Sequence, residues 1–181
     1  MRKVVAGLFM SLDGVVESPS SWAIFDEQTT AVMAAGIQQA DAILLGRRTY
    51  LEFASLWPGQ ASETPMAHFM NATPKHVVSA TLSGPLDWAN SYLVSGDLAE
   101  QVAALRAQPG RNIQVPGSPA LVQSLLRAGL LDELSLMIQP IVLGAGQRLF
   151  GELPDRLRLR LVESTTFRTG VLSVTYQPAR S

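Results

Sequence analysis

The residues best suited to chemistry lie in the segment Asp41–Tyr50, which reads DAILLGRRTY. An apolar run ends at Gly46, and Arg47, Arg48 and Thr49 follow at the point where a helix is expected to begin. Free backbone N–H groups in the first turn of a helix converge on one spot and favour an anion. Arginine side chains beside that spot can hold a phosphate through paired hydrogen bonds. The segment therefore predicts a site for a phosphorylated cofactor.

A second junction of the same kind occurs at Gly117 and Ser118. Ser118 is suited to the N-cap of a helix and Pro119 to its first turn. Two such turns at the carboxyl ends of strands could enclose one dinucleotide from both sides. Glycine and serine also begin helices for purely local reasons, so a structural role stays open for this junction. No Gly-x-Gly-x-x-Gly follows the first strand, so the usual dinucleotide fingerprint is missing.

The composition indicates a globular chain and limits its partners. Of the 181 residues, 47% are hydrophobic and 16% are charged, and the net charge is −1. These values give no electrostatic reason to expect a nucleic-acid or membrane partner. The absence of cysteine excludes disulfides and a cysteine nucleophile. With no signal peptide or membrane-length apolar run, we expect a cytoplasmic protein.

Hydrophobic periodicity positions these junctions within alternating strands and helices. Strands are expected at 4–10, 42–45, 76–79, 91–94, 112–115, 134–138, 156–167 and 171–176, and helices at 25–38, 47–56, 65–71, 97–109 and 118–129. Alternation with strands at the end predicts a three-layer α/β fold whose sheet is mostly parallel and antiparallel at its C-terminal end. No linker or repeat interrupts the pattern, so residues 1–181 are expected to form one domain.

Several short motifs in a fixed order resemble a known family. They are Ser11–Gly14, Trp22, Leu45–Tyr50, Val77–Thr81, Gly117–Ser118, Asp132–Leu134, Pro140–Gly146 and Leu149–Phe150. In this order they resemble the bacterial dihydrofolate reductase-like family that includes the reductase domain of bifunctional riboflavin biosynthesis enzymes. The resemblance extends over nearly the whole chain and implies a dihydrofolate reductase-like fold.

The resemblance also implies where a cofactor lies. NADPH would cross the sheet, with Gly46, Thr49 and the helix N-terminus at its pyrophosphate and Arg47 or Arg48 at the ribose 2′-phosphate. Ser79 would lie beside that phosphate, and Gly117 and Ser118 would approach from the opposite side. The Ser11–Gly14 loop would cover the nicotinamide and the substrate. Ala80 stands where many relatives have an arginine, so NADH stays an alternative to NADPH.

Two acids are candidates for the proton that must accompany a hydride. Asp13 lies in the loop after the first strand, and Asp26 opens the first helix four residues after Trp22. The acid of true dihydrofolate reductases follows a tryptophan in a similar way. A carboxylic acid in an apolar pocket is a suitable proton donor. The structural alternatives are an Asp-Gly turn for Asp13 and a solvent-facing acid at a helix start for Asp26.

The substrate contacts predicted from the sequence are Gly14, Trp22, Phe53 and Gln139. Trp22 and Phe53 would form an apolar wall, although a core position is the alternative for both. The two histidines lack metal-ligand spacing, so no metal is expected.

Together these features predict an NAD(P)H-dependent reductase of the dihydrofolate reductase or 5-amino-6-(5-phosphoribosylamino)uracil reductase type. Its substrate would be a small planar heterocycle such as a pterin or a pyrimidine. The alternative is a protein that binds the nucleotide without turnover, such as a sensor. The resemblance also implies a homodimer, for which the apolar residues Val171, Leu172 and Val174 of the terminal strands are candidates.

Overall fold

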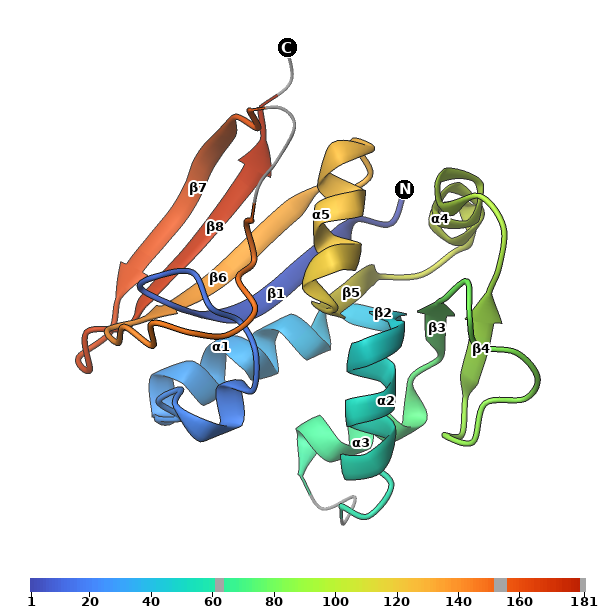
Figure 1. Ribbon diagram of the computed structural model, residues 1–181, viewed down its shortest axis with the longest axis horizontal. Coiled ribbons are helices and arrows are strands. Elements are labelled where there is room, and N and C mark those ends of the chain that lie inside the picture. Colours follow the sequence, from blue (N-terminus) through green and yellow to red (C-terminus); the bar gives the residue numbers. More distant parts are fainter. Residues whose placement is uncertain (61–63, 152–155, 180–181) are drawn as a thin grey trace.

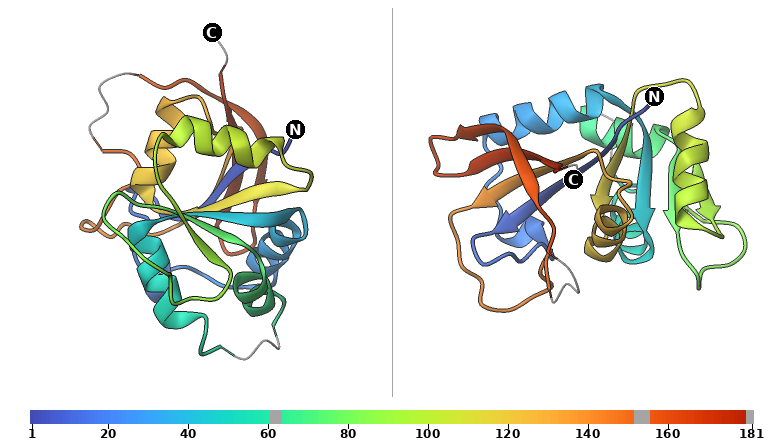
Figure 2. Two further views of the ribbon diagram at one scale, coloured as in Figure 1. Left: turned by 90° about the vertical axis from the view of Figure 1, so that its right-hand side faces the viewer. Right: turned by 90° about the horizontal axis from the view of Figure 1, so that it is seen from above.

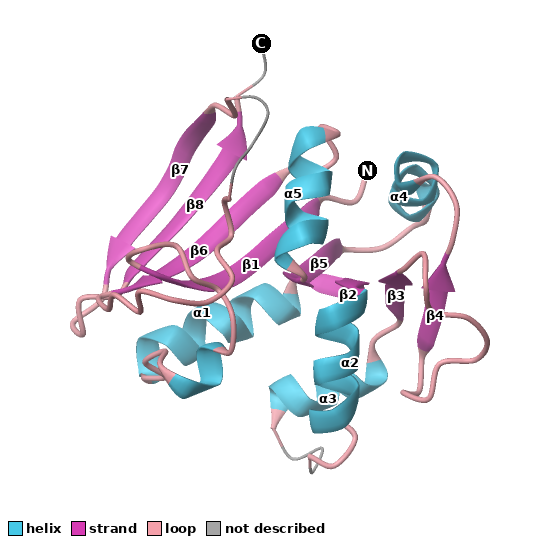
Figure 3. Ribbon diagram, in the orientation of Figure 1, coloured by secondary structure: helices cyan, strands magenta, loops and turns pink. Residues whose placement is uncertain are grey.

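The computed structural model describes residues 1–60, 64–151 and 156–179. Its centre is an eight-stranded sheet in the order β4-β3-β2-β5-β1-β6-β8-β7 (Figure 1). The strands are β1 (Val4–Ser11), β2 (Ala40–Gly46), β3 (Lys75–Val78), β4 (Ser91–Val94), β5 (Asn112–Gly117), β6 (Glu133–Gln139), β7 (Leu159–Thr166) and β8 (Leu172–Pro178). The helices are α1 (Glu27–Gln38), α2 (Arg47–Leu56), α3 (Pro65–Ala72), α4 (Leu98–Ala107) and α5 (Pro119–Arg127), with a short 3-10 helix η1 (Pro19–Ser21) before α1 (Figure 3).

Strand direction confirms the predicted fold class. Strands β1 to β6 pair in parallel wherever they are neighbours. Strand β8 runs antiparallel to both β6 and β7, which makes the C-terminal end of the sheet antiparallel. The expected strand 156–167 is shorter in the structure, where β7 begins at Leu159. The carboxyl ends of β1, β2, β3, β5 and β6 therefore meet at one edge of the sheet.

Alternating side chains give the sheet two apolar faces. Helices lie on both of these faces (Figure 2). Helices α4 and α5 cover one face, where Leu125 of α5 is fully buried. Helices α2 and α3 cover the other face through Tyr50 and Met70, which pack on Ile43 of β2. Phe9 of β1, on the same face as α2 and α3, has its ring 5.0 Å from that of Phe25, just before α1. Helix α1 thus lies on this second face, but of its side chains only Thr29 is fully buried.

The predicted helix caps position the helices that follow the parallel strands. The Asp97 carboxylate accepts a hydrogen bond from the backbone N–H of Glu100 at 3.0 Å, as the side chain of an N-cap residue does. The Ser118 hydroxyl accepts a hydrogen bond from the Leu121 N–H at 3.4 Å, with Pro119 in the first turn of α5. None of the helices in the described residues is long and apolar enough to cross a membrane.

Lys75 is a fully buried cation at the amino end of β3. Its Nζ donates hydrogen bonds to the backbone carbonyls of Met70, Asn71 and Thr73 at 2.9 to 3.3 Å, at the end of α3. The same atom lies 4.4 Å from the ring centroid of Trp88, within the range of a cation–π contact. Burial lowers the pKa of Lys75 to about 8. Lys75 therefore binds the last carbonyl groups of α3, and among the described residues its buried charge has no acidic partner.

Candidate active site

The two predicted anion-binding turns contact each other at the edge where the parallel strands end. Strands β2 and β5 are neighbours, and Leu45 pairs with Gly117 in their register. A Cβ atom added to Gly46 would lie 2.9 Å from the backbone nitrogen of Ser118. Glycine at position 46 is therefore required by this close approach. The starts of α2 and α5 consequently belong to one site.

Glycine is also required at position 117, here because of the backbone conformation. Its φ of +148° is one that residues with a side chain rarely adopt. A Cβ atom at this position would also lie 2.6 Å from the Thr49 hydroxyl oxygen. The peptide bond to Ser118 is cis. Thr49 and Gly117 thus face each other across the junction between α2 and β5.

The start of α2 offers unused hydrogen-bond donors. Its N-cap, Gly46, has no side chain that could accept from the first N–H groups of the helix. Such a turn satisfies its donors with water or with a bound anion. The cradle formed by Gly46 and Gly117, which any side chain would fill, fits a phosphate group at this position.

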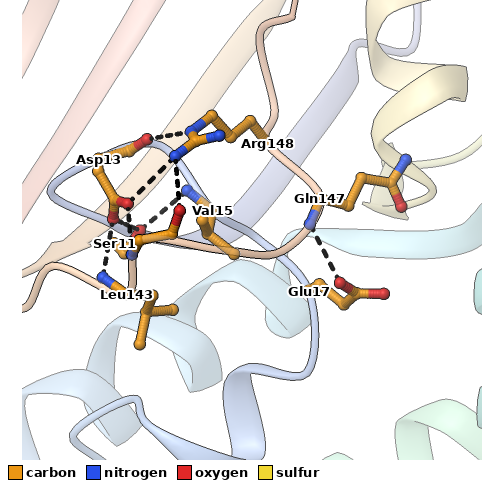
Figure 4. Close-up of polar contacts among 8 residues, drawn as sticks. Ser11, Asp13, Val15, Glu17, Leu143, Gln147 and Arg148 are labelled. Carbon is orange, nitrogen blue, oxygen red and sulfur yellow. Dashed lines mark hydrogen bonds and ion pairs between the residues drawn. The ribbon is translucent and has the colours of Figure 1, made fainter.

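Arg48 contacts two loop residues, Glu17 and Gln147, which Figure 4 labels, whereas Arg47 makes no ion pair within the described residues. Arg48 donates a hydrogen bond to the Gln147 side-chain oxygen at 3.1 Å and lies 3.8 Å from the Glu17 carboxylate. Glu17 also accepts a hydrogen bond from the Gln147 backbone N–H at 3.0 Å (Figure 4). Arg48 therefore joins α2 to two loops, whereas the Arg47 side chain makes no hydrogen bond to the residues that the structure describes.

Ser79 lies directly beyond the strand next to Gly46. Gly46 pairs with Val78 in the β2–β3 register, so Arg47 and Ser79 leave the sheet side by side. The Ser79 hydroxyl accepts hydrogen bonds from the N–H groups of Thr81 and Leu82 at 3.1 and 3.0 Å. Ser79 thus forms a turn of its own next to the first anion-binding turn.

A cleft of about 860 Å³ runs from these turns along the sheet face covered by α1, α2 and α3. Of the thirteen predicted site residues, the cleft wall contains Arg48, Thr49, Phe53 and Ser118. The Phe53 ring packs edge-on against Trp57, with centroids 6.2 Å apart, and both rings line the cleft. This volume is within the usual range for pockets that bind small molecules and cofactors.

Asp13 connects two loops and does not line the cleft. Its carboxylate accepts hydrogen bonds from the Ser11 hydroxyl at 2.7 Å and from the N–H groups of Leu143 and Gly144 at 3.1 and 2.9 Å (Figure 4). Arg148 lies 3.4 Å away. The hydrogen bond from Ser11, followed by that from Leu143, holds the pKa of Asp13 well below its usual range. An acid so firmly ionised is a poor proton donor, which argues against the predicted catalytic role.

Asp26 is the N-cap of α1, which agrees with the structural alternative considered for it. Its side chain accepts a hydrogen bond from the Thr29 N–H at 2.8 Å and another from the Thr169 hydroxyl at 3.2 Å. The Thr29 hydrogen bond is the main cause that lowers the pKa of Asp26. Asp26 also lies outside the cleft wall, so its geometry likewise argues against a role as proton donor.

Three of the predicted substrate contacts shape loops beside the cleft. The Trp22 indole N–H donates to the Glu17 carbonyl oxygen at 2.8 Å, and Gly14 adopts a turn conformation with φ of +87°. Gln139 is buried, and its side-chain oxygen accepts a hydrogen bond from the Ile24 N–H at 2.9 Å. None of the three lines the cleft. Gln139 therefore holds the segment before α1 against the end of β6.

Sequence reasoning missed polar residues of the cleft that belong to strands. Gln114, Ser135 and Thr175 lie in the cleft wall on the sheet itself. Their signal in the sequence is a polar residue at every second position of an otherwise apolar strand, which is equally typical of a solvent-facing strand. The described part of the chain contains no group of three or more histidine, cysteine or acidic side chains that could hold a metal ion.

The fold and the glycine-lined turns define the class of protein. A dihydrofolate reductase from Enterococcus faecalis, solved in complex with NADP(H), matches 98% of this chain and 97% of its own with a TM-score of 0.67 and 12% identity. The chain thus has the dihydrofolate reductase-like fold.

The family follows from the sequence match. Residues 2–173 match the model of the RibD C-terminal domain, and the chain belongs to this family. A putative riboflavin biosynthesis protein from Shewanella sp. PV-4 has a TM-score of 0.76 and 24% identity, covering 98% of this chain and 99% of that one. An uncharacterised protein of Bacillus subtilis, YyaP, is 28% identical over 97% of this chain and 94% of its own length. The predicted family resemblance is confirmed.

Proposed function

We propose that this chain is a reductase that takes a hydride from NADPH, with NADH as an alternative, and delivers it to a small planar heterocycle. One observation carries the proposal: the α2 and α5 turns approach so closely that only glycine fits at position 46, and they open directly into the cleft. A dihydrofolate reductase with this fold has been solved with NADP(H) bound. The proposal treats residues 1–181 as a single domain acting in the cytoplasm.

Each element of the site has a role in this proposal. The free N–H groups at the start of α2, together with Thr49, would hold the pyrophosphate, and Gly117 and Ser118 would approach it from the other side. Arg47 would hold the 2′-phosphate, with Ser79 beside it. Phe53 would form part of the apolar wall for a flat ring. The nicotinamide nucleotide supplies the hydride, and the protein contributes binding, orientation and exclusion of water.

A second candidate function is binding of the nucleotide without turnover. The observation that favours it is the state of the two predicted proton donors, since the pKa values of Asp13 and Asp26 are both lowered and neither acid lines the cleft. The acids that do line the cleft are Glu17, Glu52 and Glu163.

The test is a fluorescence titration with NADPH and NADH, followed by an assay of NADPH oxidation with pterin and pyrimidine acceptors. Binding with oxidation on at least one acceptor supports the reductase. Binding with no oxidation on any acceptor would support the sensor instead. If neither nucleotide binds, both proposals fail.

We also propose a homodimer formed through the C-terminal strands. The structure corrects part of the basis for this prediction, because Val171 and Val174 are buried in the core and only Leu172 is exposed. Leu161 and Val162 of β7 are exposed instead, on a strand that forms an edge of the sheet. Exposed edge strands readily pair with another chain. Light scattering should give twice the mass of the chain; the mass of a single chain would contradict the proposal.

A further inference from the structure

The cleft contains more acidic than basic side chains. Glu17, Glu52 and Glu163 line it, and among the described residues of its wall Arg48 is the one basic side chain. Arg48 is already engaged, because it lies 3.8 Å from the Glu17 carboxylate and donates a hydrogen bond to Gln147. Glu52 and Glu163 therefore have no basic partner in the described part of the wall, and their carboxylates repel an anionic ligand and attract a cation.

Aromatic rings are a second feature of the cleft that favours a cation. Six aromatic side chains line it, namely Phe9, Phe25, Phe53, Trp57, Phe69 and Phe167. Two of them, Phe53 and Trp57, form an edge-on pair on α2, and the Phe9 and Phe25 rings lie 5.0 Å apart between β1 and the segment before α1. The face of an aromatic ring attracts a cation, and it does so more strongly when the cation is removed from water. Aromatic walls together with carboxylates are suited to a flat cationic ring.

Glu52 is the carboxylate best placed to select such a ring. It lines the cleft together with Thr49 and Leu56, which share its face of α2 because they are three and four residues away in the sequence. Its side chain is exposed and makes no hydrogen bond or ion pair to the residues that the structure describes, since Arg48, one turn earlier, pairs with Glu17 instead. Glu52 thus lies between the anion-binding turn and the apolar wall, with its carboxylate open to a ligand.

A cationic substrate also agrees with the positions of the predicted proton donors. Asp13 and Asp26 lie outside the cleft wall, and hydrogen bonds lower the pKa of both, so neither is suited to protonate a ring there. A ring that already carries a C=N⁺ group needs no such proton. Its carbon gains a hydride from the reduced nicotinamide nucleotide, the π electron pair moves to nitrogen, and the product is a neutral amine beside the oxidised nucleotide. No proton is taken up or released in this step.

We propose that the substrate of this cleft is a flat, unphosphorylated ring that enters as a cation with a C=N⁺ group, and that Glu52 selects it. The inference rests on the proposed function, which identifies the cleft as the substrate site and the nicotinamide nucleotide as the hydride source. It excludes a ring with a phosphoribosyl substituent, because a phosphate would meet unpaired carboxylates and no free basic side chain among the described residues of the wall. Glu52 is thus a specificity-determining residue.

The experiment compares three probes built on one bicyclic ring. They are 1-methylquinolinium, which is cationic, 2-methylquinoline, which is neutral in mildly alkaline buffer, and quinolin-8-yl phosphate, which is anionic. Calorimetric titration is carried out in phosphate buffer, so that the phosphate probe gains nothing from the α2 and α5 turns. The wild-type protein should bind the cation about tenfold more tightly than the neutral ring, and the phosphate about tenfold more weakly than the neutral ring.

A pair of matched variants tests the role of Glu52. Glu52→Gln should weaken the cation by about threefold to fivefold and leave the neutral ring unchanged, because it removes one partly hydrated ion pair. Glu100→Gln, the same change in the first turn of α4 and outside the cleft wall, should alter neither affinity. Both changes affect an exposed side chain, and circular dichroism checks that each variant is folded. Added sodium chloride should weaken the cation in the wild-type protein and leave the neutral ring unaffected.

Oxidation of NADPH gives a second readout. The acceptor is N-methyl-3,4-dihydroisoquinolinium, a cyclic C=N⁺ ion, and the rate is compared with that of the same mixture without protein. The wild-type protein should accelerate the oxidation. Glu52→Gln should raise KM for the acceptor with little change in kcat, because the carboxylate binds the cation before hydride transfer.

The outcomes separate this inference from the proposed function. Preference for the cation together with failure to bind any nicotinamide nucleotide would support the cation site and refute the reductase. Equal binding of the three probes, tightest binding of the phosphate, an unchanged cation affinity in Glu52→Gln, or no oxidation of NADPH with the C=N⁺ ion would each overturn the inference, even if NADPH binds.

Discussion

Replacing Lys75 with methionine removes one charge from the interior while keeping an unbranched side chain. Burial lowers the pKa of Lys75 to about 8, from a usual value of 10.5. Between these two pH values the unfolded chain retains a proton that the native protein has lost. The free energy of unfolding of the wild-type protein should therefore rise with pH across this interval.

The size of the rise follows from the same two values. Across the interval from pH 8 to pH 10.5, a difference of one bound proton raises the free energy of unfolding by at most about 3 kcal/mol. The Lys75→Met variant should lack this rise. It also leaves the carbonyl groups of Met70, Asn71 and Thr73 without their donor, which lowers its stability at every pH. The lost hydrogen bonds lower stability equally at every pH. The pH dependence of the difference in unfolding free energy between wild type and variant therefore reports the effect of the Lys75 charge.

Urea unfolding followed by tryptophan fluorescence, repeated in steps from pH 8 to pH 10.5, measures this difference. Lys3 serves as the control, because it is the other lysine of the chain. Its hydrogen bond to Glu133 raises the pKa of Lys3, so the stability it contributes is lost only as pH rises above 10.5. Lys3→Met should therefore keep the wild-type rise. If the free energies of unfolding of wild type and Lys75→Met change with pH in parallel, burial of the Lys75 charge is not the cause of the rise, and the reasoning is refuted.

The remaining predictions concern the turns and the core. Replacing both Arg47 and Arg48 with alanine should weaken NADPH at least tenfold more than NADH in fluorescence titrations, since only NADPH has the 2′-phosphate; equal losses would show that the arginines do not contact it. Gly46→Ala should lower the free energy of unfolding by about 1 to 3 kcal/mol and reduce NADPH affinity at least tenfold, because the new Cβ meets the Ser118 backbone; wild-type values in thermal unfolding and titration would contradict the close approach. Leu125→Ala should cost about 2 to 5 kcal/mol in denaturant unfolding, and a loss below 1 kcal/mol would argue against the tightly packed core.

The order and direction of the elements could be predicted because local signals agreed with the fold. Ser118 caps α5 as the sequence indicates, and the apolar run that ends at Gly46 forms β2. The beginning of β7 was less predictable, since the expected strand continued back to residue 156 through alternating arginines and leucines. Pairing with β8 determines where that strand begins, and such pairing depends on distant residues.

The candidate site was predictable only in part. The turns at Gly46 and Gly117 follow from helix-start chemistry, and both form the close junction that the structure shows. The catalytic role expected of Asp13 depended on loop position alone, whereas its pKa is lowered first by the hydrogen bond from Ser11 and then by N–H groups about 130 residues away. Gln114 carries only an ambiguous local signal, because a polar residue in an alternating strand is equally typical of a strand that faces solvent.

The distribution of the two lysines has a practical consequence for covalent labelling. Lys75 is sealed inside the protein, whereas the Lys3 side chain is 54% exposed and Met1 is 99% exposed. Amine-reactive dyes and coupling surfaces should therefore attach at Lys3. Lys3 directly precedes β1 at its amino end, about 25 Å along the strand from the edge that carries the glycine turns. The native protein can thus be tethered or labelled in one orientation, with the cleft mouth left free, without introducing a cysteine.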